Sequence, residues 1–152
     1  MIRNTKHTLA AALVAAMTLA AVGVAVSSTD TIKDRQHAME NVGGAMQTLA
    51  AIAKGEAPFD AAVVKKNAVA MQDHLQKAAA LFPEGSDKGD VETWATPAVW
   101  SDNPDFVAKF EAAEAEAEAI GSVTEESAFR PALGKLGNSC KSCHETYRRP
   151  KK

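Results

Sequence analysis

The chain has 152 residues, of which 46% are hydrophobic, 24% charged and only 5% aromatic. This composition is typical of a soluble domain whose core consists of closely packed helices. With 17 Lys and Arg against 19 Asp and Glu, the formal net charge is −2. There is thus no basic excess of the kind that neutralises nucleic-acid phosphates, and nucleic-acid binding is excluded as a function.

The first 25 residues have the pattern of a signal peptide. Arg3 and Lys6 provide a positive start, and an uncharged run from Leu9 to Val26 ends in small residues. The run is long enough for an uncleaved membrane anchor, but Ala and Gly are weakly hydrophobic, which favours cleavage. We therefore predict a signal peptide over residues 1–25, export to the periplasm, and a single mature domain over residues 26–152.

Two amphipathic helices are predicted in the first half of the mature chain, because apolar residues recur there at steps of three and four. The first runs from about Thr31 to Lys54, and Gly55 is suited to end it. After a turn, the second runs from about Asp60 to Leu81. The inner line of the first helix comprises Ile32, Arg35, Met39, Val42, Met46, Leu49 and Ala53.

A long connection follows, from about Pro83 to Asn103, and it contains both tryptophans, Trp94 and Trp100. A loop of this length is usually functional or disordered. The tryptophans indicate that it packs on something, and the sequence leaves open whether that is the core or the edge of a cofactor. Asn103 is a good N-cap for a third helix, with Pro104 at its first helical position.

The fourth helix is predicted from Ser122 towards Arg149. Ser122 and Glu125 have the spacing of a capping box. Pro131 is expected to kink or interrupt this helix, because proline removes a backbone donor. Four amphipathic helices without any strand pattern predict an all-α fold, an antiparallel four-helix bundle.

The sequence Cys140-Lys141-Ser142-Cys143-His144 matches the attachment motif for a c-type haem. On a helix the two cysteines lie one turn apart, so both sulfurs can form thioethers to one porphyrin. His144 can then supply the proximal iron ligand. The motif predicts one haem c per chain, bound covalently through Cys140 and Cys143 on the C-terminal helix.

Other interpretations of the two cysteines are weaker. A structural zinc site needs four ligands, and the chain has no second cysteine pair. A disulfide between cysteines three residues apart closes a very short loop and stabilises little. A thioredoxin-like site belongs beside a βαβ unit, which the pattern lacks. A haem-free helical module that uses the pair as a redox dithiol remains as an alternative.

A haem motif on the last helix of a four-helix bundle resembles the class II cytochromes c, the family of cytochrome c prime and cytochrome c-556. Arg35-Gln36 with Met39 resembles the family's Arg-Gln-x-x-(Leu/Met) segment. Residues 51–60, 97–102 and 140–148 resemble its helix-to-helix turn, the loop before its third helix and its end. The family often forms homodimers through its first two helices, so the resemblance allows a homodimer here.

The resemblance places Met39 over the distal face of the haem. A thioether bound to the iron gives a six-coordinate, low-spin site with a raised reduction potential, which suits an electron carrier. Without that bond the site is five-coordinate and open to NO or CO. A flexible filler of the core is the third interpretation of Met39. Similarity of the first turn and of residues 81–85 to the c-556 type favours His144/Met39 ligation.

Arg35 lies one turn before Met39 on the inward side, and a buried guanidinium needs a partner. A haem propionate is the obvious one, and the resemblance implies the same role for Gln36. For Arg148 it implies a place on the proximal face. We find no paired catalytic acids, nucleophile triad or phosphate-binding loop. The sequence therefore predicts a periplasmic electron carrier rather than an enzyme, and it does not identify the redox partner.

Overall fold

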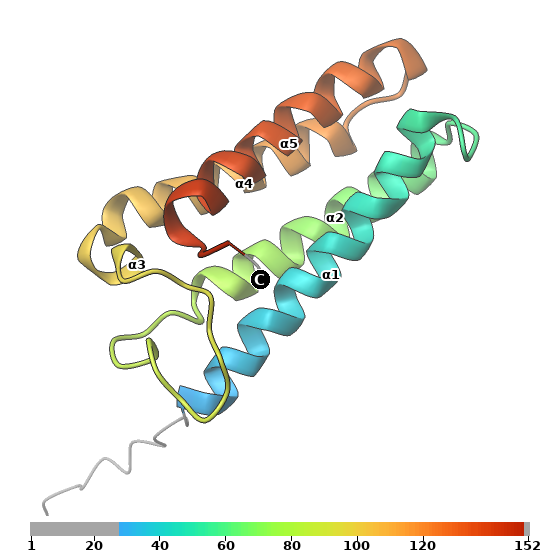
Figure 1. Ribbon diagram of the computed structural model, residues 1–152. Helices are drawn as coiled ribbons and strands as arrows, with labels where there is room; N and C mark the ends of the chain where they lie inside the picture. The colour runs from blue at the N-terminus through green and yellow to red at the C-terminus, as the bar shows by residue number, and fades with distance from the viewer. Residues whose placement is uncertain (1–27, 151–152) are drawn as a thin grey trace, which may run out of the picture.

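Five helices make up the part of the chain that the computed structural model describes, residues 28–150 (Figure 1). They are α1 (Ser28–Lys54), α2 (Ala61–Ala79), α3 (Ala98–Ser101), α4 (Asn103–Gly121) and α5 (Glu126–Tyr147). The four long helices form the predicted bundle, and the prediction of an all-α fold is confirmed. None of the helices in residues 28–150 combines the length and the apolar character needed to cross a bilayer. The predicted signal peptide lies outside the described residues.

The bundle is open on one side. α1 packs on α2, α2 on α4 and α4 on α5, whereas α1 and α5 make far fewer contacts with each other. Figure 1 shows α1 and α5 diverging, with a gap between them on the side facing the viewer. The two helices that carry the predicted distal and proximal residues therefore form the two walls of one face of the bundle.

Local signals set the ends of α1 and α2. Gly55 has a φ of 77°, a left-handed conformation that glycine adopts without steric cost. Its amide donates to Ile52 O at 3.0 Å and the next amide to Ala51 O at 2.9 Å, the bonds of a Schellman motif. Asp60 caps α2, since its Oδ1 accepts from the amide of Ala62 at 2.7 Å.

The junction between α4 and α5 differs from the prediction. Ser122 does not begin a capping box with Glu125: it ends α4, and its hydroxyl donates to Glu118 O at 3.2 Å. Glu125 is itself the N-cap residue of α5. Pro131 lies inside α5 without ending it. It is the sixth residue of the helix, beyond the four amides at the start that have no intrahelical partner, so it removes one backbone hydrogen bond.

The residues that α1 buries differ in part from those predicted. Small residues at positions 38 and 45 are buried, whereas Met39 and Met46 are only half-buried at the margin of the core. Alanines at these positions let α1 approach α2 closely. The larger methionine side chains are displaced to the margin of the packed face.

The connection between α2 and α3 is ordered by contacts with α1. We call residues 81–96 the strap. The amide of Asp90 donates to Thr29 Oγ1 at 2.9 Å. A Cβ on Gly89 would lie 2.9 Å from Ile32 Cδ1 and 3.2 Å from the Cα of Thr29. The strap thus passes so close to the start of α1 that only glycine fits at position 89.

Gly89→Ala is therefore expected to destabilise the protein by about 1–3 kcal/mol, the usual cost of overpacking. Ile32 is fully buried, and the Cα of Thr29, 3.2 Å from the added Cβ, belongs to the backbone, so the change forces a shift in the packing. The matched control is Gly134→Ala, at an exposed position in α5 where a Cβ meets nothing within 4 Å. That change should stabilise by roughly 0.5–1 kcal/mol, because glycine is unfavourable inside a helix. Urea unfolding measures both, and equal effects of the two substitutions would contradict close packing at Gly89.

Candidate functional site

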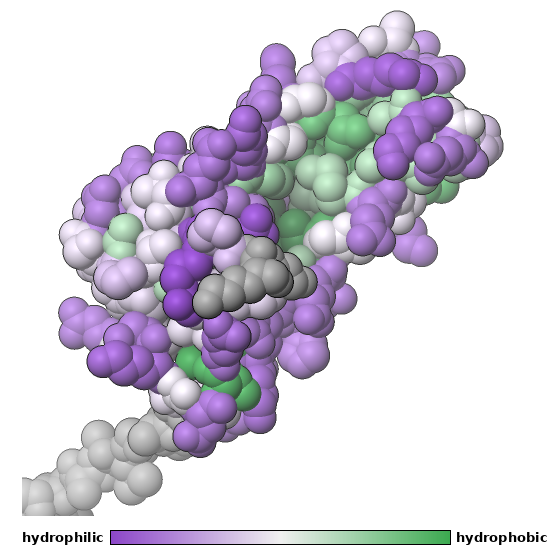
Figure 2. All heavy atoms as spheres, viewed as in Figure 1, coloured by the Kyte–Doolittle hydropathy of each residue, from purple (hydrophilic) through white to green (hydrophobic). Residues whose placement is uncertain are grey.

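A cavity of about 790 Å³ lies between α1, the strap and the C-terminal half of α5. Figure 2 shows hydrophobic side chains at the bottom of the hollow between α1 and α5. Part of the cavity wall is aromatic: Phe106 packs edge-to-face on Phe110 and on Phe82, with ring centroids 5.0 and 4.7 Å apart. A volume of this size is within the range of roughly 300–1,000 Å³ for small-molecule and cofactor sites.

The structure brings most of the predicted site residues together around this cavity. Those that line it are Arg35, Gln36, Met39, Cys143, His144 and Arg148. Cys140 is not part of the lining, but it lies one turn before Cys143 on α5 and packs against the core. Of the two tryptophans, Trp94 lines the cavity. Trp100 lies against Phe82 instead, and its indole N–H donates to Pro83 O at 3.0 Å.

The two cysteine side chains are free thiols in partly buried positions. Burial raises the pKa of Cys140, and burial together with Cys140 raises the pKa of Cys143 to about 11. Reactive cysteines in redox Cys-x-x-Cys motifs have a lowered pKa, because the thiolate is the nucleophile. These environments therefore favour the role of covalent anchors over that of a redox dithiol.

His144 is held in its neutral form. Burial lowers its pKa, and the positive charge of Arg148 lowers it further. Neutral imidazole is the form that binds a metal ion. Within residues 28–150 no three His, Cys, Asp or Glu side chains gather into a metal site.

These features fit a haem. The donor set is two thiols on successive turns followed at once by an imidazole, which suits a porphyrin iron. On the opposite wall, a Cβ on Gly43 would meet nothing within 4 Å, so α1 leaves open space there. The aromatic side chains supply the apolar contact that a flat macrocycle requires.

Arg35 has partners within the protein. It is 4% exposed and lies over the ring of Phe82, with Cζ 4.8 Å from the centroid. Its Nη2 donates to Ser86 O at 2.8 Å and to Thr93 Oγ1 at 2.7 Å. Its Nη1 donates to Ser86 Oγ at 3.1 Å and to Leu81 O at 3.3 Å. The strap thus satisfies this buried guanidinium without a propionate.

Gln36 and Arg148 also meet the strap. The side-chain amide of Gln36 donates to Glu92 O at 2.7 Å. Arg148 pairs with Ala95 in an isolated antiparallel bridge, while its side chain is exposed. The sequence left open that the tryptophans of this connection lie at a cofactor edge, but it did not indicate Ser86 or Thr93, because no motif shows where such a loop docks.

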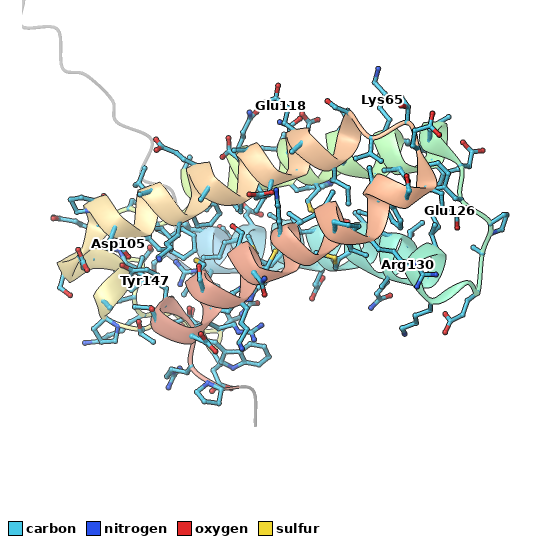
Figure 3. All side chains as sticks on the ribbon, turned by 90° about the horizontal axis from the view of Figure 1, so that it is seen from above. Lys65, Asp105, Glu118, Glu126, Arg130 and Tyr147 are labelled. Atoms are coloured by element: carbon cyan, nitrogen blue, oxygen red, sulfur yellow. The ribbon has the colours of Figure 1, made fainter. Side chains whose placement is uncertain are left out.

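Tyr147 closes one end of the cavity and is tied to α4. Its hydroxyl donates to Asp105 Oδ2 at 2.6 Å, and Figure 3 shows the two residues side by side. Its ring packs edge-to-face on Phe106 with centroids 5.2 Å apart. No pattern in the sequence indicates this hydrogen bond, because its two partners are 42 residues apart.

Tyr147→Phe is expected to lower the stability of the holoprotein at neutral pH, and the loss should shrink above about pH 10. The hydrogen bond to Asp105, and then burial, hold the pKa of Tyr147 well above its ordinary value. The folded state therefore keeps a proton that the unfolded phenol loses near pH 10, so the stabilisation is complete below that pH and declines above it. Urea midpoints of both proteins at neutral pH and at about pH 11 measure this. A difference that widens at the higher pH would contradict it.

A family model described as Cytochrome C' matches residues 30–148 of the chain. The chain belongs to the cytochrome c' family. Cytochrome c' of Rhodopseudomonas palustris is 37% identical over 92% of this chain and 96% of its own length. Cytochrome c-556 of Agrobacterium fabrum is 36% identical over 82% of this chain and 84% of its own length.

Solved structures agree with this assignment. The structure of cytochrome c' from Rhodopseudomonas palustris superposes with a TM-score of 0.76 at 37% identity, and the match covers 81% of this chain and 98% of the other. A nitric oxide complex of a mutant cytochrome c' from Alcaligenes xylosoxidans superposes with a TM-score of 0.73 at 31% identity, over 82% and 98% of the two chains. The predicted family and the predicted four-helix bundle are thus confirmed, and the cofactor is haem c, held through the two cysteines.

Proposed function

We propose that this cytochrome c' family member is a periplasmic electron carrier in which His144 and Met39 are the axial ligands of the haem iron. The observation that carries the proposal is that Met39 and His144 line one cavity from two different helices, α1 and α5. When bound, the haem supplies a one-electron redox centre whose potential methionine ligation raises.

Each residue has a distinct task in this proposal. Cys140 and Cys143 would hold the macrocycle to α5 through two thioether bonds. His144, kept neutral by burial, presents an imidazole nitrogen to one face of the macrocycle. Met39 presents a thioether to the other face, and Gly43, one turn further along α1, leaves room for the ring.

The ferric absorption spectrum of the purified holoprotein tests the axial ligation. Two strong ligands produce a low-spin ferric iron, so we expect a low-spin spectrum and slow binding of CO by the reduced protein, limited by departure of the methionine. A high-spin ferric spectrum, or CO binding without delay, would contradict Met39 as a ligand.

The second candidate is a five-coordinate haem protein that binds NO or CO at an open distal position. Two observations favour it. The Alcaligenes relative is described as a nitric oxide complex, and the side chain of Met39 is only half-buried, so it has room to rotate away from the iron. The same spectrum decides between the two candidates, since this one requires a high-spin ferric state.

The proposed location and partners follow from residues outside the site. Export to the periplasm depends on the predicted signal peptide over residues 1–25, and a mature protein that retains these residues would contradict it. α2 exposes two valines, Val63 and Val69, which are 37% and 51% exposed. The homodimer stays a prediction, as does the absence of enzymatic activity.

A further inference from the structure

The strap connects the two helices that carry the proposed axial ligands. α1 and α5 make few direct contacts, so the distance between them is determined through α2 and α4 and through any other segment that bonds to both. The strap runs across this gap from the start of α1 to the last turn of α5 (Figure 1). Its contacts with each helix can be traced atom by atom.

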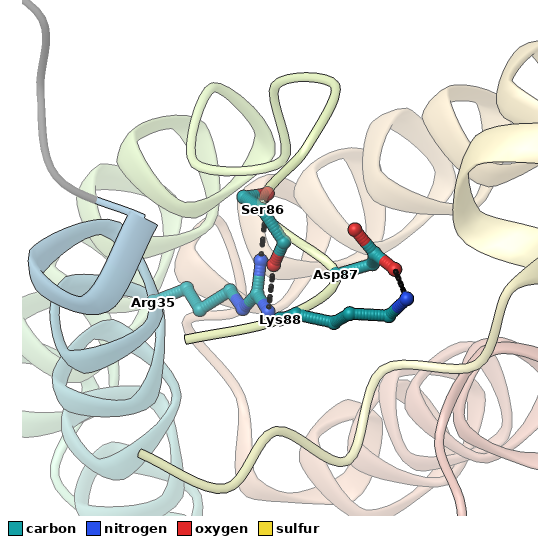
Figure 4. A network of polar contacts seen from close by, with 4 residues as sticks. All are labelled: Arg35, Ser86, Asp87 and Lys88. Carbon is teal, nitrogen blue, oxygen red and sulfur yellow. Dashed lines mark hydrogen bonds and ion pairs between the residues drawn. The ribbon is translucent and has the colours of Figure 1, made fainter. Parts of the chain in front are cut away.

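On α1 the anchor is Arg35. Figure 4 shows the guanidinium reaching from α1 to the backbone carbonyl and the hydroxyl of Ser86. The planar group lies against the rings of Phe82 and Trp100, with Cζ 4.8 and 5.8 Å from their centroids. An arginine donates from a rigid planar fork, so four acceptors and two rings leave the side chain one orientation.

On α5 the anchors are mainly backbone hydrogen bonds at its C-terminal end. The amide of Thr96 donates to Tyr147 O at 3.0 Å, and the amide of Arg149 donates to Trp94 O at 2.7 Å. The hydroxyl of Thr96 adds a bond to Thr146 O at 3.1 Å. These bonds hold the segment directly after His144 to the strap.

Thr93 joins the two sets of anchors. Its Oγ1 accepts from Arg35 at 2.7 Å, and its carbonyl oxygen accepts from the side chain of Arg149. One residue of the strap is therefore bonded to α1 through its side chain and, through its backbone, to Arg149, two residues beyond the end of α5. Thr93 is thus a direct link between Arg35 and the segment that follows the proximal helix.

We propose that Arg35 is a positioning residue that, through Thr93, sets the distance between α1 and α5 and thereby the position of Met39 relative to His144. This role differs from contact with a haem propionate, because Arg35 acts on the polypeptide. The part that concerns the iron ligands depends on the proposed function; the part that concerns the strap does not.

The test compares three variants of the holoprotein. Arg35→Lys keeps the positive charge but loses the planar fork. Thr93→Val keeps the shape of the side chain and removes the hydroxyl that accepts the hydrogen bond from Arg35. The control, Lys33→Gln, removes a positive charge from an exposed position on the same helix. Hydrogen–deuterium exchange of the Thr96 and Arg149 amides measures how firmly the strap is held to the end of α5. The rate of CO association with the reduced protein measures how firmly Met39 holds the distal side of the haem.

We expect the Thr96 and Arg149 amides to exchange at least about tenfold faster in Arg35→Lys and in Thr93→Val, since each loses a hydrogen bond made by a charged group. CO association should accelerate in the same two variants, and Lys33→Gln should match the wild type in both measurements. A folded Thr93→Val variant suffices for the test if Arg35→Lys does not fold.

Two outcomes would overturn the proposal. Unchanged exchange at Thr96 and Arg149 would show that Arg35 does not hold the strap. A change of CO association in Arg35→Lys but not in Thr93→Val would show that Arg35 acts on the haem directly. If the ferric wild type is already high-spin, Met39 is not an iron ligand. The exchange data would still decide whether Arg35 holds the strap.

Discussion

Replacing both Cys140 and Cys143 with serine is expected to abolish covalent attachment of the haem. A serine hydroxyl does not form the thioether that joins each cysteine to a vinyl group, so no bond to the polypeptide remains. In the wild type the haem should stay with the chain under denaturing conditions, and in the double variant it should separate completely. Mass spectrometry of the denatured proteins measures this directly.

The matched control for this substitution is Ser142→Ala, within the same motif. The hydroxyl of Ser142 makes a local bond to Ser139 O at 3.1 Å, and its loss leaves both thiols and His144 in place. This variant should keep one covalent haem. A double serine variant that still carries haem after denaturation would show that other residues attach it.

Met39→Ala is expected to convert the ferric haem from low spin to high spin. Alanine has no atom that can bind iron, and the cavity on that side stays open, because a Cβ on Gly43 would have no neighbour within 4 Å. CO should then bind to the reduced variant without the delay that methionine departure imposes on the wild type. Absorption spectra in both oxidation states, with stopped-flow mixing, provide the measurement.

Met46→Ala is the matched control, since Met46 lies on the same helix and is also half-buried. It is two turns away from Met39, about 10 Å along the axis, so its loss should leave the spin state unchanged. If Met39→Ala has the same ferric spectrum as the wild type, Met39 is not a ligand, and the gas-binding candidate becomes the better account of the distal side.

The parts of the fold that were predicted correctly depend on local chemistry. The glycine at position 55 ends α1 because its backbone adopts a positive φ, and Asp60 caps α2 with its own side chain. The haem motif is a contiguous string, and helix geometry alone brings its cysteines to one face. In each case the residues that decide the structure are within one or two turns of one another.

The incorrect predictions concern competition between neighbouring signals. Ser122 has a capping spacing towards α5, yet it is used to end α4, and the sequence does not show which helix takes it. Pro131 was expected to kink or interrupt the helix, yet α5 starts at Glu126 rather than Ser122 and continues through Pro131, its sixth residue. The short helix α3 within the connection was not predicted at all, since four residues show no periodicity.

The remaining part of the site depends on contacts between residues far apart in the sequence. Arg35 reaches Ser86 and Thr93, which are 51 and 58 residues away. Burial of Arg35 was predicted from its place on the inner line, and so was its need for a partner. A haem propionate was predicted as that partner, whereas the acceptors on the strap could not be predicted, because the strap has no pattern that indicates where it docks on α1 and α5.

The proposed function requires a haem that is held by Cys140, Cys143 and His144 on α5. Its most direct test is the haem content of the mature protein, produced in a host that attaches c-type haem, together with a titration of free thiols. We expect a coloured protein with one covalently bound haem per chain and no free thiol. A colourless protein in which both thiols react would contradict covalent haem attachment.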